Sequence, residues 1–330
     1  MEVCKIRLRT FFLFIFILMT TKVSAFEIFQ FSVAPKYALQ NGLVSEYVLC
    51  DYNNHTESQL DWDLQWLSLF GFNASLGWEK IFIESDCMWA IPKNSGTLYD
   101  SDWLNTSDLG MKTNYSESSN SVSYLGRLDL KLGLNIKTWD FLHVLPYAGI
   151  SYSRINFTGN GGTYWYGNKS YTGLSYDVSY DSPYAVSGSL EGDVISYQSE
   201  IFSYNLGVKV KYNFLKRFTA SLDFCMDIFT QANAIDNHLK KDRDYLDKMQ
   251  GFFRAIKIGS ELDVKIWKGL SAGLGFNYKY LFLVKGQDYT KSSSDSTYTR
   301  CSDSLYSGYT VSGGTSGWYY SMEIFARYSF

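Results

Sequence analysis

Apolar and polar residues alternate strictly over several long stretches of the chain. From Phe202 to Phe214 every second residue is apolar, and the residues between them are Ser, Asn, Gly or Lys. The same division appears over 124–136 and 218–228. Because successive side chains of a strand point to opposite faces, this period of two predicts β-strands with one apolar and one polar face. Lysines repeated on the polar face suit the lumen of a transmembrane barrel and not the core of a soluble sandwich.

Ten stretches of this kind can be counted along the chain. An even number of strands is typical of bacterial single-chain barrels. The pattern therefore predicts an all-β fold, a ten-stranded antiparallel transmembrane β-barrel. The predicted strands lie near residues 28–49, 58–70, 74–90, 124–136, 143–158, 202–214, 218–228, 252–266, 270–282 and 320–330.

The connections between these stretches alternate in length. Short turns are predicted near residues 71–73, 138–142, 215–217 and 267–269, and long polar loops near 50–57, 91–120, 159–197, 233–250 and 287–315. Outer-membrane barrels have short periplasmic turns and long extracellular loops, so length alone predicts the orientation. Several stretches exceed the roughly 9–11 residues that span a bilayer. Their outer ends are expected to project beyond the membrane.

The N-terminus has the pattern of a secretory leader. Lys5, Arg7 and Arg9 precede an apolar run over 11–19, and Val23-Ser24-Ala25 ends on a cleavage-site pattern. The run is shorter than the roughly 20 residues of a transmembrane helix. We therefore expect a signal peptide at residues 1–25, one barrel domain at 26–330, and a location in the bacterial outer membrane with the active site facing outside.

Composition agrees with a membrane barrel and excludes some partners. Aromatic residues make up 18% of the chain, with 26 Gly and 4 Pro, as in transmembrane strands with aromatic girdles. A net charge of −3 gives no indication of nucleic-acid binding.

The cysteines allow two interpretations. Export permits disulfide bonds, and the sequence leaves open whether the cysteines form disulfides or stay as free thiols. The sequence predicts no cofactor and shows no metal site. The cysteines beyond the leader are Cys50, Cys87, Cys225 and Cys301.

Two polar segments combine residues that could hydrolyse a bond. Asp100 and Asp102 fall in the second predicted long loop, and Asp236 and His238 follow a strand expected to end near residue 229. Both segments are predicted at the extracellular end. A carboxylate beside a histidine fixes the imidazole tautomer and stabilises the imidazolium, so the other ring nitrogen can deprotonate water. Exposed loop acids without a function are the competing interpretation.

Short motifs are spread over the mature chain. They are Ser58-Gln59-Leu60-Asp61-Trp62, Asp100-Ser101-Asp102-Trp103, Ser153-Arg154, Phe157-Thr158, Gly161-Gly162-Thr163-Tyr164, Asp236-Asn237-His238 and Tyr328-Ser329-Phe330. In order and spacing they resemble the motifs of the omptins, an outer-membrane endopeptidase family. The resemblance implies that Asp100 and Asp102 form an aspartyl couple, that His238 is the general base with Asp236 as its orienting partner, and that water is the nucleophile.

The resemblance also concerns substrate choice. Omptins cleave next to basic residues through an acidic pocket, and Glu46 stands where the family has its pocket glutamate. The second acid is expected two residues before the dyad aspartate, where this chain has Ala234. We therefore expect a weaker or shifted preference for basic residues. Asp247-Lys248 is similar to the family's groove wall.

Omptins require lipopolysaccharide, and Arg154 stands at one position of that lipid site. Its expected basic neighbours are replaced by Ile150 and Tyr152, so lipopolysaccharide or another outer-membrane lipid is the expected activator. Peptides or proteins at the cell surface are the expected substrates. The competing functions are a surface adhesin or receptor that uses the long Tyr-, Ser- and Gly-rich loops, and a small pore. Oligomeric state stays open.

Overall fold

Residues 29–330 form one barrel in the computed structural model, and the expected signal peptide at 1–25 lies outside these described residues. The single described helix, α2 (Lys169–Thr172), has four residues. Along residues 29–330 no helix reaches the length and apolar character needed to cross a membrane. The strands are β1 (Phe29–Cys50), β2 (Thr56–Trp78), β3 (Ile81–Ala90), β4 (Lys93–Asp102), β5 (Asn114–Leu134), β6 (Ile136–Trp139), β7 (Leu142–Tyr166), β8 (Val186–Phe214), β9 (Phe218–His238), β10 (Arg243–Trp267), β11 (Leu270–Ser292), β12 (Thr299–Arg300) and β13 (Val311–Ser329).

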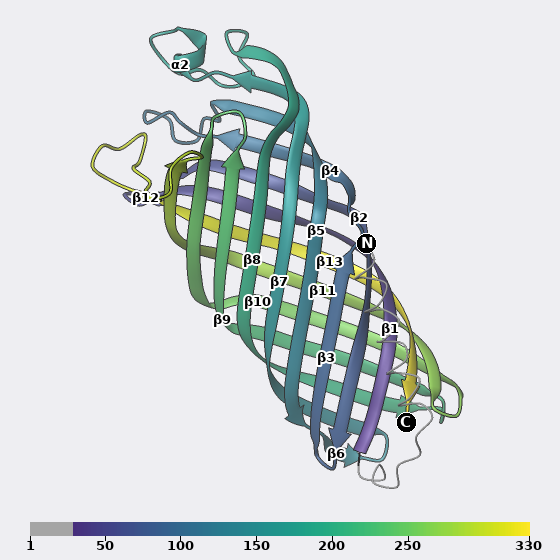
Figure 1. Cartoon of the computed structure of the whole chain (residues 1–330). Helices are drawn as coiled ribbons and strands as arrows, with labels where there is room; N and C mark the ends of the chain where they lie inside the picture. Colours follow the sequence, from purple (N-terminus) through teal and green to yellow (C-terminus); the bar gives the residue numbers. More distant parts are fainter. Residues whose placement is uncertain (1–28) are drawn as a thin grey trace.

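The sheet closes on itself through antiparallel pairs. β1 pairs with β2 on one side and with β13 on the other, and the remaining long strands pair in sequence order between them (Figure 1). β3 and β4 occupy one position in the ring, since both pair with β2 and both pair with β5. The ring therefore has ten positions, which confirms the predicted ten-stranded barrel.

The break between β3 and β4 falls at Ile91-Pro92. Proline has no backbone N–H to give to a ladder, so it interrupts a strand between two partners. β2 bridges the interruption, because its residues 69–78 pair with β3 and its residues 58–62 pair with β4. The wall therefore stays closed although one of its strands is made of two pieces.

One predicted turn is wrong. β2 continues through residues 71–73 to Trp78, and the chain reverses at Glu79 and Lys80, where Glu79 has a positive φ of 51°. Gly71 lies within the predicted turn. In the structure it is a strand residue, because a Cβ there would overlap the backbone carbonyl of Cys87 on β3. The glycine allows a close approach of two strands.

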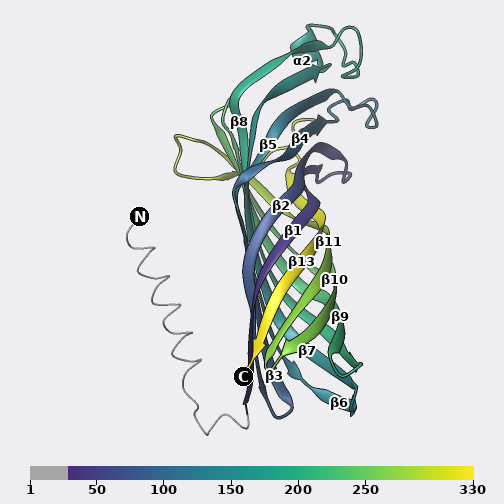
Figure 2. The same cartoon turned by 90° about the vertical axis from the view of Figure 1, so that its right-hand side faces the viewer.

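The predicted long loops are shorter than expected because the strands continue into them. β8 has 29 residues and β7 has 25, and the ends of β4, β5 and β8 rise above the rest of the barrel in Figure 2. The connections at this end cover residues 51–55, 103–113, 167–185, 239–242 and 293–310, and we call it the mouth. Side-chain alternation weakens there because both faces are polar, whereas the backbone ladder continues.

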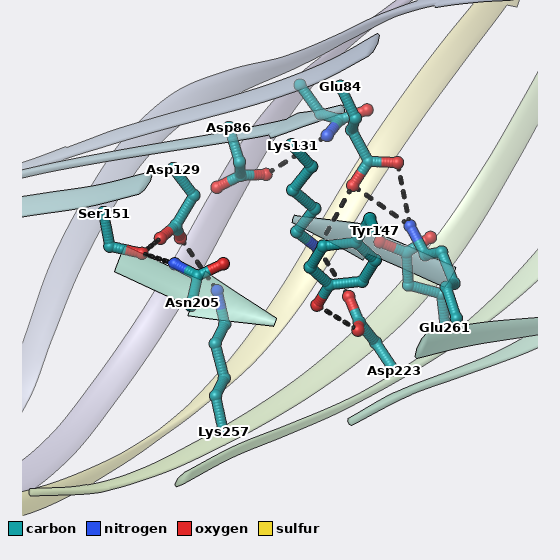
Figure 3. Close-up of polar contacts among 12 residues, drawn as sticks. Glu84, Asp86, Asp129, Lys131, Tyr147, Ser151, Asn205, Asp223, Lys257 and Glu261 are labelled. Atoms are coloured by element: carbon teal, nitrogen blue, oxygen red, sulfur yellow. Dashed lines mark hydrogen bonds and ion pairs between the residues drawn. The ribbon is translucent and has the colours of Figure 1, made fainter. Parts of the chain in front are cut away.

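Side chains confirm the predicted division between the two faces of the wall. On β8, Tyr204 and Leu206 are 52% and 53% exposed on the outside, whereas Asn205 and Lys209 are each 5% exposed inside. The buried charges of the lumen are paired with each other (Figure 3). The pairs include Lys36–Asp86 at 2.7 Å, Lys209–Glu84 at 3.0 Å, Lys257–Asp129 at 2.8 Å, Lys279–Asp227 at 3.3 Å and Arg327–Asp263 at 2.7 Å.

An aromatic stack separates this lumen from the mouth. Trp62 of β2 stacks on Phe157 of β7 at 5.1 Å and on Tyr197 of β8 at 5.9 Å between ring centroids, and all three are buried. Stacked aromatic pairs contribute about 0.5–1.5 kcal/mol beyond their burial. The stack is part of the largest apolar cluster of the barrel. It therefore forms a dry floor under the mouth and opposes the interpretation as a pore.

Candidate active site

The four candidate catalytic residues lie in strands, so their predicted placement in loops is wrong. Asp100 and Asp102 are near the end of β4, and Asp236 and His238 end β9. β4 and β9 stand on different walls of the mouth, with β5, β7 and β8 between them in the ring. The register turns both pairs inward, and the charges of Asp100 and His238 influence each other. The structure thus brings the two segments together on rigid elements.

The histidine and its neighbour form a dyad. Nε2 of His238 lies 2.7 Å from Oδ2 of Asp236. The imidazole ring packs edge-on against Tyr245 of β10, with 5.0 Å between ring centroids. Burial opposes a charge on the imidazole, but the Asp236 carboxylate outweighs it and raises the pKa of His238 above 6.5. The dyad therefore orients the ring and leaves Nδ1 as the nitrogen that can accept a proton.

The aspartyl couple lies on the other wall of the mouth. Burial, and then the neighbouring Asp102 carboxylate, raise the pKa of Asp100 to about 7. The side-chain amide of Asn114 on β5 donates to Oδ2 of Asp102 at 3.1 Å. Two adjacent carboxyl groups with one of them hydrogen-bonded can hold a single proton between them near neutral pH.

Three further carboxylates line the same mouth. Glu46 of β1, Asp247 of β10 and Asp288 of β11 are 4%, 6% and 3% exposed. The charges of Asp247 and Asp288 act on Glu46, so the three carboxylates lie near one another, and the role of Glu46 as a pocket acid stays a prediction. Ala234 of β9 pairs directly with Asp247, which in turn pairs with Asp288. The structure therefore brings two carboxylates to the place where the sequence shows a missing acid.

Sequence reasoning missed Asp288 altogether. The residue was assigned to a loop over 287–315, whereas β11 continues to Ser292. No periodic signal could have found it, because the register shifts between Leu281 and Val284 and moves the inward positions of β11 from odd-numbered to even-numbered residues. Asp288 is therefore out of phase with the predicted strand.

These pocket acids have no basic partner. Oε2 of Glu46 and Oδ1 of Asp288 are buried without a hydrogen-bond partner, and within residues 29–330 no Lys or Arg side chain forms an ion pair with Glu46, Asp247 or Asp288. Burial and then repulsion from neighbouring carboxylates raise the pKa of Glu46 and of Asp247. The lumen below shows the opposite arrangement, with its buried acids paired to Lys or Arg. The Arg300 guanidinium donates to the backbone carbonyl of Asp288 and not to its carboxylate, so the three pocket carboxylates have no direct cationic partner among the described residues.

A glycine gives one of these acids its position. Gly313 of β13 lies against the carboxylate of Asp247, and a Cβ at this residue would overlap Oδ1 and Cγ of that side chain. Asp247 belongs to β10, so its side chain reaches across β11 toward β13 and β1. Glycine makes this reach possible and brings the carboxylate toward Glu46.

Arg154 lies apart from this site on the outer side of β7. Its guanidinium donates to Oε1 of Gln198 at 2.7 Å, forms an ion pair with Glu200 at 3.2 Å and lies over the ring of Tyr124.

Among the described residues the cysteines form no disulfide bond. Cys50, Cys87, Cys225 and Cys301 are all free thiols.

The fold and the site define an antiparallel β-barrel of ten strand positions with a group of buried carboxylates at one end. The family model of the omptin family matches residues 29–322, so the chain belongs to the omptin family. This membership places the protein among outer-membrane proteases.

Two individual proteins show the degree of similarity. A plasminogen activator from Yersinia pestis is 23% identical over 230 residues, which cover 67% of this chain and 67% of that protein. The outer membrane protease OmpT from Escherichia coli superposes with a TM-score of 0.78 at 15% sequence identity, covering 91% of this chain and 97% of that chain. At this identity the likeness to OmpT concerns the fold.

Proposed function

We propose that the protein is an endopeptidase whose nucleophile is a water held between the aspartyl couple and the dyad. Neutral His238 takes a proton from the water at Nδ1, and the water oxygen bonds to the carbonyl carbon of the peptide. Asp236 stabilises the imidazolium that forms. The proton then passes to the nitrogen of the leaving amine as the C–N bond breaks.

The aspartyl couple acts on the opposite side of the water. With a pKa of about 7, Asp100 exchanges a proton near neutral pH, and Asp102 is held by Asn114. The couple therefore orients the water and can hydrogen-bond the oxygen that gains charge as the carbonyl is attacked.

We propose further that the pocket formed by Glu46, Asp247 and Asp288 takes a Lys or Arg side chain of the substrate. The observation that carries this proposal is the set of buried carboxylate oxygens without a partner. Buried charge is costly unless it is paired. A substrate ammonium or guanidinium would supply the missing charge and form charge-assisted hydrogen bonds. Basic preference should therefore persist although Ala234 occupies one acidic position.

Arg154 and a membrane lipid complete the proposal. Arg154 is partly exposed on the outer wall and, within residues 29–330, forms an ion pair with Glu200 alone, so its guanidinium can also contact a lipid phosphate. Lipopolysaccharide or another outer-membrane lipid would then act as the activator, with the mouth facing outside.

Catalysis is tested with the barrel refolded in lipopolysaccharide and a library of peptides. His238→Ala and Asp100→Ala should each abolish cleavage, whereas His143→Ala, at the opposite end of the barrel, should leave it unchanged. Cleavage that persists in both site variants would reject the mechanism. A folded wild-type barrel that cleaves no peptide in any lipid would reject the activity.

A further inference from the structure

A second cluster of acidic groups lies at the rim of the mouth. It consists of Cys50, the last residue of β1, Glu57 at the start of β2, and Asp303 in the connection between β12 and β13. One potential ligand atom from each residue lies within 4.8 Å of the others. The three residues are 1%, 4% and 8% exposed. Two connections far apart in sequence thus meet at one buried point.

Each carboxylate of this cluster is held through one oxygen and leaves the other free. The backbone N–H groups of Leu305 and Tyr306 both donate to Oδ1 of Asp303 at 2.7 Å, and the hydroxyl of Ser304 donates to Oε2 of Glu57 at 3.4 Å. Oδ2 of Asp303 and Oε1 of Glu57 are buried and accept no hydrogen bond from a residue outside the cluster, within which the side chain of Asp303 interacts with those of Glu57 and Cys50. Buried carboxylate oxygens without a donor are costly, so their presence indicates a missing partner.

The missing partner is positively charged. Within residues 29–330 neither Glu57 nor Asp303 forms an ion pair with a Lys or Arg side chain. A cation placed among the three residues would pair with both carboxylates and contact both of their free oxygens.

We propose that Cys50, Glu57 and Asp303 bind a divalent transition-metal ion, for which Zn²⁺ is the best match. One thiolate with two carboxylates is a mixed donor set that Zn²⁺ accepts, whereas Ca²⁺ and Mg²⁺ take oxygen ligands alone. Three protein ligands leave a fourth tetrahedral position for water. Sequence spacing gives no sign of this site, because its ligands come from two chain segments about 250 residues apart.

The bound ion would act as a clamp beside the candidate catalytic residues. The backbone carbonyl of Glu57 accepts from the N–H of Trp103 at 2.9 Å, and the next residue, Ser58, pairs with Asp102. Fixing Glu57 therefore fixes the edge of β4. The ion would join connection 51–55 to connection 293–310 and hold both walls of the mouth in register.

Cobalt substitution tests the site without any measurement of peptide cleavage. The refolded barrel is freed of metal with a chelator and titrated with Co²⁺, which gives a near-ultraviolet charge-transfer band when a thiolate binds it. We expect one Co²⁺ per chain with this band, and its loss when Zn²⁺ is added. Cys50→Ser should lose the band, whereas Cys87→Ser, a thiol in the barrel wall, should retain it.

Each other outcome rejects the site. A folded wild-type barrel without the band would mean that the two carboxyl groups only share a proton. A band that survives in Cys50→Ser would assign the ion to another thiol. If Cys50→Ser fails to fold, Asp303→Asn answers the same question, because retained Zn²⁺ competition in that variant also contradicts the proposal. Because the readout is spectroscopic, the result for the metal site does not depend on whether the protease mechanism is correct.

Discussion

Replacing Glu46 with Gln isolates the contribution of one pocket charge, since the side chain keeps its shape and loses its carboxylate. Oε2 of Glu46 is buried without a donor, so a substrate cation would form a new hydrogen bond there. Hydrogen bonds to charged groups contribute about 1.5–3 kcal/mol. This energy corresponds to a loss of about 10- to 150-fold in kcat/KM for a peptide with Arg or Lys beside the cleaved bond.

The same substitution should leave the fold at least as stable as before. Burial and then repulsion from Asp236 and Asp247 raise the pKa of Glu46, so its ionised form is unfavourable in the folded barrel. A neutral amide removes this repulsion. The urea midpoint of Glu46→Gln should therefore equal or exceed that of the wild type, which separates an effect on the substrate from damage to the barrel.

The assay compares peptides that differ at one position, with Arg, Lys or the neutral isostere norleucine beside the cleaved bond. Glu46→Gln should lower kcat/KM for the two basic peptides and leave the norleucine peptide unchanged. Glu79→Gln, in an exposed turn at the other end of the barrel, is the matched control. Equal losses for basic and neutral peptides, or no loss for either, would refute the role of the pocket.

Three further substitutions test other parts of the structure. Asp236→Asn removes the charge that raises the pKa of its histidine partner, so the acid limb of the kcat/KM–pH profile should move to lower pH; an unmoved limb would exclude that histidine as the base. Lys209→Met leaves Glu84 with a weaker partner and should destabilise the barrel by about 3 kcal/mol in urea; an unchanged midpoint would contradict this. Gly313→Ala displaces the Asp247 carboxylate and should reduce preference for basic over neutral peptides, which a peptide series measures.

The strands within the apolar band could be predicted because one face meets a polar lumen and the other an apolar surface. On β8 the exposed Leu206 and the buried Lys209 follow this contrast. The predicted turn at 71–73 failed because Gly71 serves a close strand contact, which a single chain segment cannot reveal.

The candidate site could be predicted in part. Short spacings and the family resemblance identified Asp100, Asp102, Asp236 and His238, which are near neighbours within their segments. Pairings across the barrel could not be predicted in this way. Asp247 and Asp288 meet only through the register of β10 and β11, and Lys257 finds Asp129 across 128 residues of chain.

The floor of Trp62, Phe157 and Tyr197 makes the mouth a trough with a single opening. A polypeptide cannot be threaded through such a barrel end first, and its fragments must leave on the side from which they came. When a substrate segment lies across the trough, the chain on both sides of that segment stays outside the barrel. Binding therefore does not require a free end of the substrate. Under the proposed function, an exposed loop of a folded protein would therefore enter from the same side as a short peptide.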